Sequence, residues 1–87
     1  MRAGKIDANH SLIREALIAH GWRVKSTASL PGWVDLVAQR GERTVLIEVK
    51  SPRGTPTASQ IALKSAGWEI VTLRDLADVT TLSRRMR

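Results

Sequence analysis

Two β-rich segments, residues 33–39 and 44–51, flank a short turn and constrain the fold more than any other part of the chain. The turn contains Gly41, and glycine supplies the positive φ that tight hairpins require. In both segments apolar residues alternate with other residues, so that one face of the hairpin is entirely apolar. That face consists of Val34, Leu36, Ala38, Val45, Ile47 and Val49. Burial of this face sets the strand register, in which Asp35 opposes Glu48.

A helix is predicted before the hairpin, over residues 9–20, because apolar residues recur there at helical spacing. These residues are Leu12, Ile13, Ala16 and Leu17. Asp7 or Asn9 can cap the start of this helix, and Gly21 suits its end. Residues 22–26 alternate large and polar side chains, as expected of a short half-buried strand. The chain is therefore expected to enter the hairpin from a helix and a strand.

After the hairpin, the sequence predicts a loop followed by three more elements. Residues 52–56 contain two prolines and a glycine, and Thr57 with Gln60 then matches the Thr-x-x-Gln capping box of a helix start. Residues 68–73 have the composition of a strand, and Asp75 can cap a last helix. The predicted order of elements is αβββαβα.

The composition limits the size and the kind of core. The chain has 87 residues, of which 43% are hydrophobic and 3% aromatic, and it lacks cysteine. A chain of this length has room for one core, so we expect a single α/β domain over residues 1–87 with a small aliphatic interior. Trp22 and Trp68 are predicted to lie in that core. Trp33 is expected either to stack on a base or to be buried in the core or a dimer contact.

The charge and the hydropathy pattern indicate the partners. A formal net charge of +6 favours polyanions such as nucleic acid. We expect the last helix to end near Leu82 and residues 84–87 to form a flexible basic tail. No apolar run reaches the roughly 18 residues that a membrane span needs, and the first residues lack the apolar stretch of a secretory signal. These features predict a soluble, cytoplasmic protein with no membrane partner and no small-molecule cofactor.

The predicted register brings two carboxylates, Asp35 and Glu48, together on the polar face of the hairpin, with Lys50 on the same face. Opposed like charges on neighbouring strands destabilise a sheet by about 0.2–1 kcal/mol. Mg²⁺ reverses that effect, because it binds one or two carboxylates and completes its shell with water and phosphate oxygens. The carbonyl of Val49 is a further candidate ligand. Since such a cation acidifies a bound water, which Lys50 can orient or deprotonate, these residues form a candidate phosphodiesterase centre.

Three motifs follow one another along the chain: Gly-Trp-Val-Asp ending at Asp35, Ile-Glu-Val-Lys ending at Lys50, and Thr-x-x-Gln ending at Gln60. Over about residues 7–82 they resemble the PD-(D/E)XK nuclease superfamily, and most closely its small VRR-NUC and archaeal Holliday-junction-resolvase-like members. The resemblance implies a restriction-endonuclease-like αβββαβ core, with helices flanking a mixed central sheet. It also implies that Asp35 and Glu48 hold Mg²⁺ or Mn²⁺ and that Lys50 lies at the attacking water. Gln60 is then expected to support the site from its helix.

Two positions depart from the pattern of that superfamily. Val34 stands where a proline usually precedes the aspartate. Asn9 and His10 stand about where the first helix often supplies a glutamate to the metal. Either side chain can bind a metal-bound water or DNA, but neither adds a negative charge.

Three further candidates have two interpretations each. Gln60 also serves as the capping-box partner of Thr57, and we expect one amide conformation to fill only one of its two roles. Arg53, in the loop after the second motif, and Lys25 are expected to contact DNA phosphates or to face water.

Together these expectations describe a Mg²⁺-dependent DNA endonuclease, selective for branched or duplex DNA and suited to DNA repair. Because one active centre cuts one strand, we expect a homodimer with two centres. The resemblance further implies a bacterial or phage-encoded intracellular protein. The alternative is a catalytically weak or inactive DNA-binding module with a nuclease-like fold, acting in replication or repair, which the missing helix glutamate favours.

Overall fold

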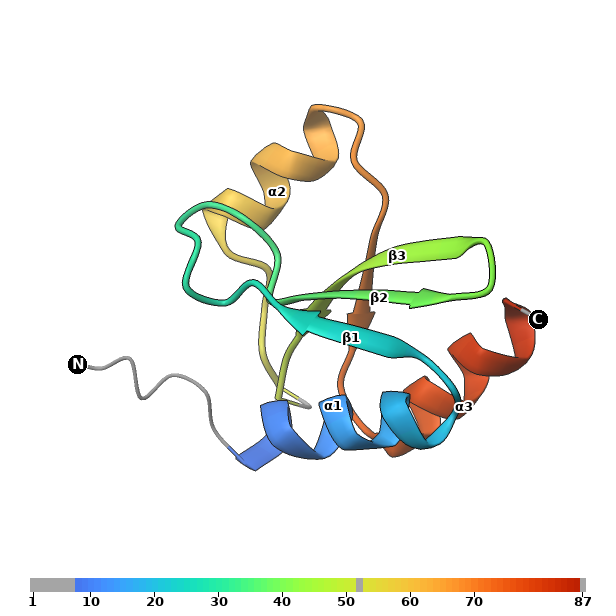
Figure 1. Ribbon diagram of the computed structural model, residues 1–87. Helices are drawn as coiled ribbons and strands as arrows, with labels where there is room; N and C mark the ends of the chain where they lie inside the picture. Colours follow the sequence, from blue (N-terminus) through green and yellow to red (C-terminus); the bar gives the residue numbers. More distant parts are fainter. Residues whose placement is uncertain (1–7, 52, 87) are drawn as a thin grey trace.

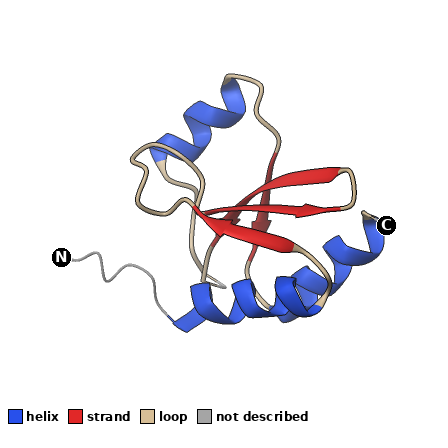
Figure 2. Cartoon of the chain, viewed as in Figure 1, coloured by secondary structure: helices blue, strands red, loops and turns tan. Residues whose placement is uncertain are grey.

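The computed structural model describes residues 8–51 and 53–86, which form three helices and four strands (Figure 1 and Figure 2). The elements are α1 (Ala8–Ala19), β1 (Arg23–Ser26), β2 (Leu36–Arg40), β3 (Arg43–Val49), α2 (Ala58–Ser65), β4 (Ile70–Leu73) and α3 (Leu76–Arg85). Their order confirms the predicted αβββαβα arrangement and the α/β class.

The four strands form one mixed sheet in the order β1-β2-β3-β4. β2 pairs antiparallel with both β1 and β3, whereas β3 and β4 are parallel and are connected through α2. The hairpin has the predicted register, with Gln39 paired to Thr44 and Leu36 to Ile47. Gly41 in its turn has a φ of 61°, a conformation that residues with a side chain rarely adopt. The local pattern of the sequence therefore determines how the two strands meet.

The apolar face of the hairpin packs against α1 and α3, which lie side by side below the sheet in Figure 1. The buried core cluster consists of Ile13, Leu17, Trp22, Leu36, Ala38, Val45, Ile47, Leu73, Val79 and Leu82. α2 lies on the opposite side of the sheet. Two helices thus cover the apolar face of the sheet, and the polar face of the hairpin faces α2.

One arginine links the core to the ends of α1 and α3. Trp22 is buried, as predicted, and its Nε1 donates to Ser83 Oγ at 3.0 Å. The Arg40 guanidinium lies 4.6 Å from the centroid of the Trp22 ring. It also donates to the carbonyls of His20 (2.9 Å), Ser83 (2.5 Å) and Met86 (3.1 Å). A single cation therefore satisfies carbonyls at the C-terminal ends of both helices.

Asp7 and Asn9 are the two alternative caps predicted for the first helix; Asn9 lies inside α1 and does not cap it, and Asp7 lies outside the described residues. The prediction of a flexible basic tail is wrong. α3 continues through Arg85, so Arg84 and Arg85 belong to a helix and not to a flexible tail. The reason for the longer helix is the bonding of its last carbonyls by Arg40, a residue of β2.

β2 is shorter than predicted, because it begins at Leu36 and a closed loop precedes it. Thr27 closes this loop at its base. Its N–H donates to the Asp35 carbonyl at 2.8 Å, and its Oγ1 donates to the Val34 carbonyl at 2.7 Å. The residues before Leu36 therefore form a closed loop beside the sheet and do not lengthen β2.

The prediction that Trp68 belongs to the core is wrong. β4 begins at Ile70, so Trp68 lies in the connection from α2, where its side chain is 50% exposed. Its ring packs edge-on against Trp33, with centroids 5.0 Å apart and planes at 90°. Trp68 therefore contacts a residue of another loop and is not buried under the sheet.

Candidate functional site

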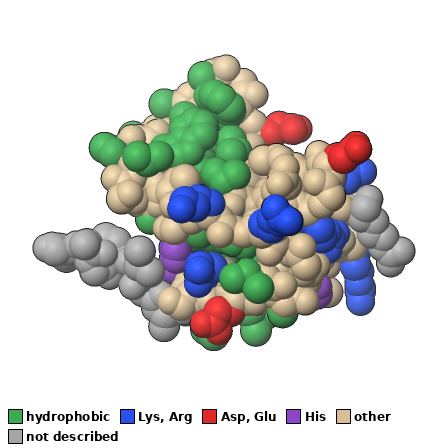
Figure 3. Space-filling view, viewed as in Figure 1, with side chains coloured by type: hydrophobic (Ala, Val, Ile, Leu, Met, Phe, Trp, Pro, Cys, Tyr) green, Lys and Arg blue, Asp and Glu red, His purple; other side chains and the backbone are tan. Residues whose placement is uncertain are grey.

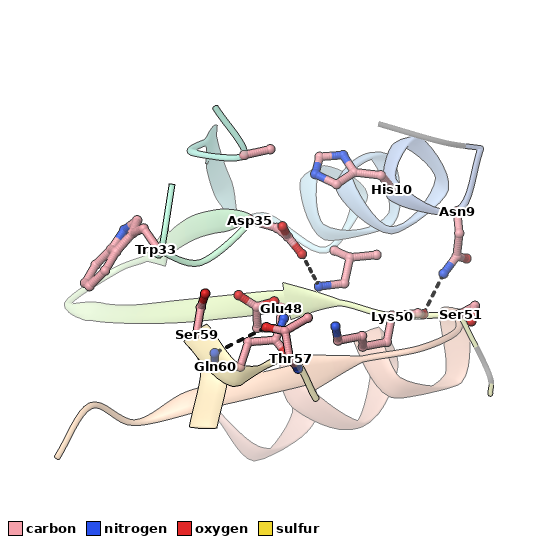
Figure 4. A pocket seen from close by; sticks show the side chains of 13 residues that line it. Asn9, His10, Trp33, Asp35, Glu48, Lys50, Ser51, Thr57, Ser59 and Gln60 are labelled. Carbon is pink, nitrogen blue, oxygen red and sulfur yellow. Dashed lines mark hydrogen bonds between the residues drawn. The ribbon is translucent and has the colours of Figure 1, made fainter. Parts of the chain in front are cut away.

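A cleft of about 390 Å³ opens at the ends of the hairpin strands, between α2 and the first turn of α1 (Figure 4). Its walls come from the loop between β1 and β2, the first turns of α1 and α2, and the chain at the end of β3. The predicted site residues that line it are Asn9, His10, Asp35, Glu48, Val49, Lys50 and Gln60. The fold thus gathers at one cleft most of the candidates that the sequence distributes over half of the chain.

Asp35 lies directly before β2, and its side chain reaches across to β3. Its backbone N–H donates to the Ile47 carbonyl at 3.1 Å, so the two segments remain hydrogen-bonded before the first residue of β2. Its Oδ2 accepts the N–H of Val49 at 2.8 Å. This bond holds the carboxylate beside Glu48, and the two acids meet on one side of the sheet as the register predicts (Figure 4).

Glu48 is only 2% exposed, a rare position for a carboxylate. Its Oε2 accepts a hydrogen bond from Gln60 Nε2, whereas its Oε1 is buried without a hydrogen-bond partner among the described residues. Burial, followed by the negative charge of Asp35, raises the pKa of Glu48 to about 7, although Lys50 and Lys64 act in the opposite direction. Without a cation, a state in which both Asp35 and Glu48 are ionised is therefore unfavourable near neutral pH.

Gln60 serves two roles at once, contrary to the expectation that its amide can fill only one. The capping box of α2 is complete, because Thr57 Oγ1 accepts the Gln60 N–H and Gln60 Oε1 accepts the Thr57 N–H. The nitrogen of the same amide donates to Glu48. An amide has an acceptor end and a donor end, so one rotamer caps the helix and binds the acid. Gln60 is buried in this position.

Lys50 directly follows β3, and a folded loop supports its side chain. Its N–H donates to the Leu73 carbonyl at 3.1 Å, which continues the parallel pairing with β4. A Cβ placed on Gly54 would lie 3.3 Å from the Lys50 Cδ, so the loop backbone packs closely on the lysine stem. Arg74 Nη1 holds this loop by donating to the carbonyls of Ser51 (2.9 Å) and Gly54 (2.7 Å). The backbone bond to Leu73 and the packing of the loop on its stem therefore position Lys50 in the cleft.

Asn9 and His10 both lie at the cleft, but they have different surroundings. Asn9 Nδ2 donates to the carbonyls of Lys50 (2.8 Å) and Arg74 (3.3 Å), and so it links α1 to the ends of two neighbouring strands. This contact gives Asn9 a structural role. His10 is buried and lines the cleft from α1 (Figure 4). Its side chain occupies the helix position expected for an additional acidic ligand.

The two basic candidates lie outside the lining of the cleft. Lys25 is exposed on β1, beside a shallow hollow over β2, and Arg53 is exposed in the loop after β3. Sequence reasoning missed Lys64, whose charge acts on Glu48, and the loop anchor Arg74. Lys64 follows Gln60 by one helical turn, so helical spacing was a signal for it. For Arg74 the sequence holds no comparable signal.

The residues at the cleft fit a hard divalent cation such as Mg²⁺ or Mn²⁺. The donor set is two carboxylates, and Glu48 Oε1 is a buried acceptor without a hydrogen bond within the described chain. No group of three or more His, Cys, Asp or Glu side chains able to hold a metal occurs in residues 8–51 and 53–86. Mg²⁺ needs no such group, because water and substrate phosphate complete its coordination. The arrangement is therefore that of an open site.

Comparisons of the chain with models of known protein families and with curated proteins find no match. Within the described residues, every helix is too short or too polar to span a lipid bilayer.

Proposed function

We propose that the protein is a metal-dependent endonuclease of the PD-(D/E)XK type, with a restriction-endonuclease-like core, that hydrolyses phosphodiester bonds in DNA. The observation that carries this proposal is the convergence of Asp35 with the buried Glu48, beside Lys50. Burying one acid next to another destabilises a fold, so stability alone gives no reason for the arrangement. A strongly raised pKa in a cleft is instead typical of a functional site.

Each residue has a defined task in this proposal. Asp35 and Glu48 hold the divalent cation, and the carbonyl of Val49 is the additional candidate ligand. The bound cation supplies a more acidic water and neutralises charge on the phosphate. Lys50 orients or deprotonates the attacking water. Gln60 acts as a positioning residue, because its amide nitrogen fixes the orientation of the Glu48 carboxylate.

The charge of the chain supports DNA as the substrate. A net charge of +6 attracts a polyanion such as DNA. Arg53 lies in the loop directly after Lys50, and we propose that it contacts a phosphate near the cleft, with Lys25 a more distant contact. An enzyme of this type would act inside the cell, where its substrate is found.

The proposal is tested by incubating supercoiled plasmid and branched DNA with the protein in Mg²⁺ or Mn²⁺. We expect nicking that EDTA abolishes, and a loss of about a hundredfold in Lys50→Ala, since positioned proton transfer contributes about 10²–10⁴ in rate. Arg43→Ala is the matched control, because Arg43 is exposed at the hairpin turn, at the far end of the strands from the cleft. Cutting that survives Lys50→Ala would contradict the assignment.

A DNA-binding module without turnover is the second candidate. It is favoured by one observation: Asn9 is engaged by two carbonyls and His10 is not acidic, so this part of α1 adds no negative charge to the cleft. Binding of the same DNA substrates without cutting in every metal would support this candidate.

We also propose that the enzyme is a homodimer, since two centres are needed to cut both strands of a duplex or a branch. Six large apolar side chains are exposed among the described residues: Leu12, Leu30, Ile61 and Leu76 at more than half, Trp68 at half and Ile18 at slightly less than half. Sedimentation equilibrium at tens of micromolar is expected to give a dimer. A monomer at that concentration would rule the dimer out.

A further inference from the structure

The loop between β1 and β2 and the chain after α2 together expose an apolar surface that no element of the fold covers. It consists of Leu30, Trp33 and Trp68, and we call it the tryptophan surface. Leu30 and Trp68 are each at least half exposed, and Trp33 is half-buried. Figure 3 shows hydrophobic side chains gathered over α2 and the neighbouring loop, at the top of the molecule.

This surface is continuous with the candidate active site. Trp33 lines the same cleft as Asp35 and Glu48, and it forms the edge of that cleft farthest from α1 (Figure 4). Trp33 also contacts Trp68 edge-on, with ring centroids 5.0 Å apart. In a perpendicular contact the edge of one ring meets the face of the other, so further ring surface stays available for stacking. The aromatic rings thus extend from the cleft toward solvent.

The charges around this surface favour a polyanionic occupant. Across the sheet face that looks toward α2, Lys25 pairs with Val37, Val37 with Leu46, and Leu46 with Ile70. Lys25 therefore lies at one end of a half-buried apolar row, and Lys64 lies beside Trp68 at the other end. Arg85 and the single acid Glu69 line the same hollow as Lys64 and Trp68, so cations outnumber acids here. DNA that crossed this face would bring phosphates to these cations and bases to the rings.

We propose that the tryptophan surface stacks on unpaired nucleobases adjacent to the scissile phosphate, so that the substrate carries a single-stranded or splayed segment at the cut. This inference rests on the proposed nuclease function and specifies its substrate class. Bases in an intact duplex are paired and stacked on each other, so an aromatic side chain reaches them only where the strands separate. Stacking of this kind tolerates any sequence, because every base has a π-face. The preference is therefore for DNA structure and not for base sequence.

The test compares the binding of labelled oligothymidylate with that of a blunt duplex of equal length, by fluorescence anisotropy in EDTA so that no cutting occurs. We expect Trp68→Ala to weaken oligothymidylate binding about tenfold and to leave duplex binding unchanged. Trp68→Phe is expected to retain most of the affinity, because phenylalanine also stacks. Leu76→Ala is the control, since Leu76 is equally exposed at the start of α3.

A second measurement keeps the test informative if Trp68→Ala does not fold. Oligothymidylate, but not duplex, is expected to quench the tryptophan emission of the wild-type protein, because Trp22 is buried and the other two rings face the cleft and solvent. If Trp68→Ala lost affinity equally for oligothymidylate and for duplex, or lost affinity for neither, the inference would be overturned. A sedimentation change from dimer to monomer in Trp68→Ala would assign the surface to a second copy instead. If wild type cuts DNA but shows no such preference, only this inference fails; if the preference holds without cutting, only the enzymatic function fails.

Discussion

Asp35→Asn is expected to abolish DNA cleavage, with a rate at least about a thousandfold below that of the wild type. The substitution removes one of two negative charges from the cation site, and a loss of about 4 kcal/mol in transition-state stabilisation corresponds to that factor. The amide oxygen of an asparagine can still accept the Val49 N–H that Oδ2 accepts now. We therefore expect the variant to fold and to bind DNA. The measurement is the single-turnover rate on nicked and branched substrates in Mg²⁺.

The same variant is expected to be more stable than the wild type in the absence of metal. The negative charge of Asp35 is the second cause of the raised pKa of Glu48, so its removal moves that pKa down toward the ordinary value. Glu42→Gln is the matched control, because Glu42 carries the same charge in the exposed hairpin turn. Cleavage by Asp35→Asn at the rate of Glu42→Gln would disprove the metal-ligand role.

The stability of the metal-free protein is expected to fall as the pH rises from about 4.5 to about 7. The pKa of Glu48 is about 7 in the folded protein against an ordinary 4.5, so the folded state binds this proton more tightly. Its contribution is fully present below the ordinary pKa and is lost as the pH passes the folded pKa. For this one group the change in the free energy of unfolding is of order 3 kcal/mol. Urea unfolding in EDTA at a series of pH values measures it.

Glu48→Gln separates this effect from the titration of other groups. Its amide has no proton to lose in this range, and its oxygen can still accept from Gln60 Nε2. The difference between the wild-type and variant profiles should therefore contain the predicted slope. Mg²⁺ is expected to stabilise the wild type more at pH 8 than at pH 5.5, since it binds the ionised carboxylates and competes with protons. A pH-independent difference between wild type and variant would contradict the assigned burial of Glu48.

The capping box shows how a correct local prediction can miss a functional contact. The Thr-x-x-Gln spacing predicts the bonds between Thr57 and Gln60, and both are present. It carries no information about the other end of the amide, which reaches Glu48 only because α2 returns over the polar face of the sheet. The prediction that Gln60 fills a single role was therefore wrong for a tertiary reason.

The end of α3 and the exposure of Trp68 also depend on tertiary contacts that the sequence pattern does not show. The basic composition of residues 84–87 suggested a flexible tail, yet Arg40 from β2 bonds the carbonyls of Ser83 and Met86 and extends α3 through Arg85. The sequence predicts Trp68 as a core residue at the start of a strand over residues 68–73. Its exposure follows from the start of β4 two residues later, and that boundary depends on pairing with β3.

By itself, the sequence determined the order of the elements, the hairpin register and the presence of Asp35 opposite Glu48. Period-two alternation and a glycine turn act between residues close along the chain, so they can be recognised without coordinates. Only the tertiary structure decided that Glu48 is buried, that Gln60 binds it, and that Asn9 links α1 to two strand ends. Those features depend on which distant segments meet, and burial itself, which raises the pKa of Glu48, arises only when they do.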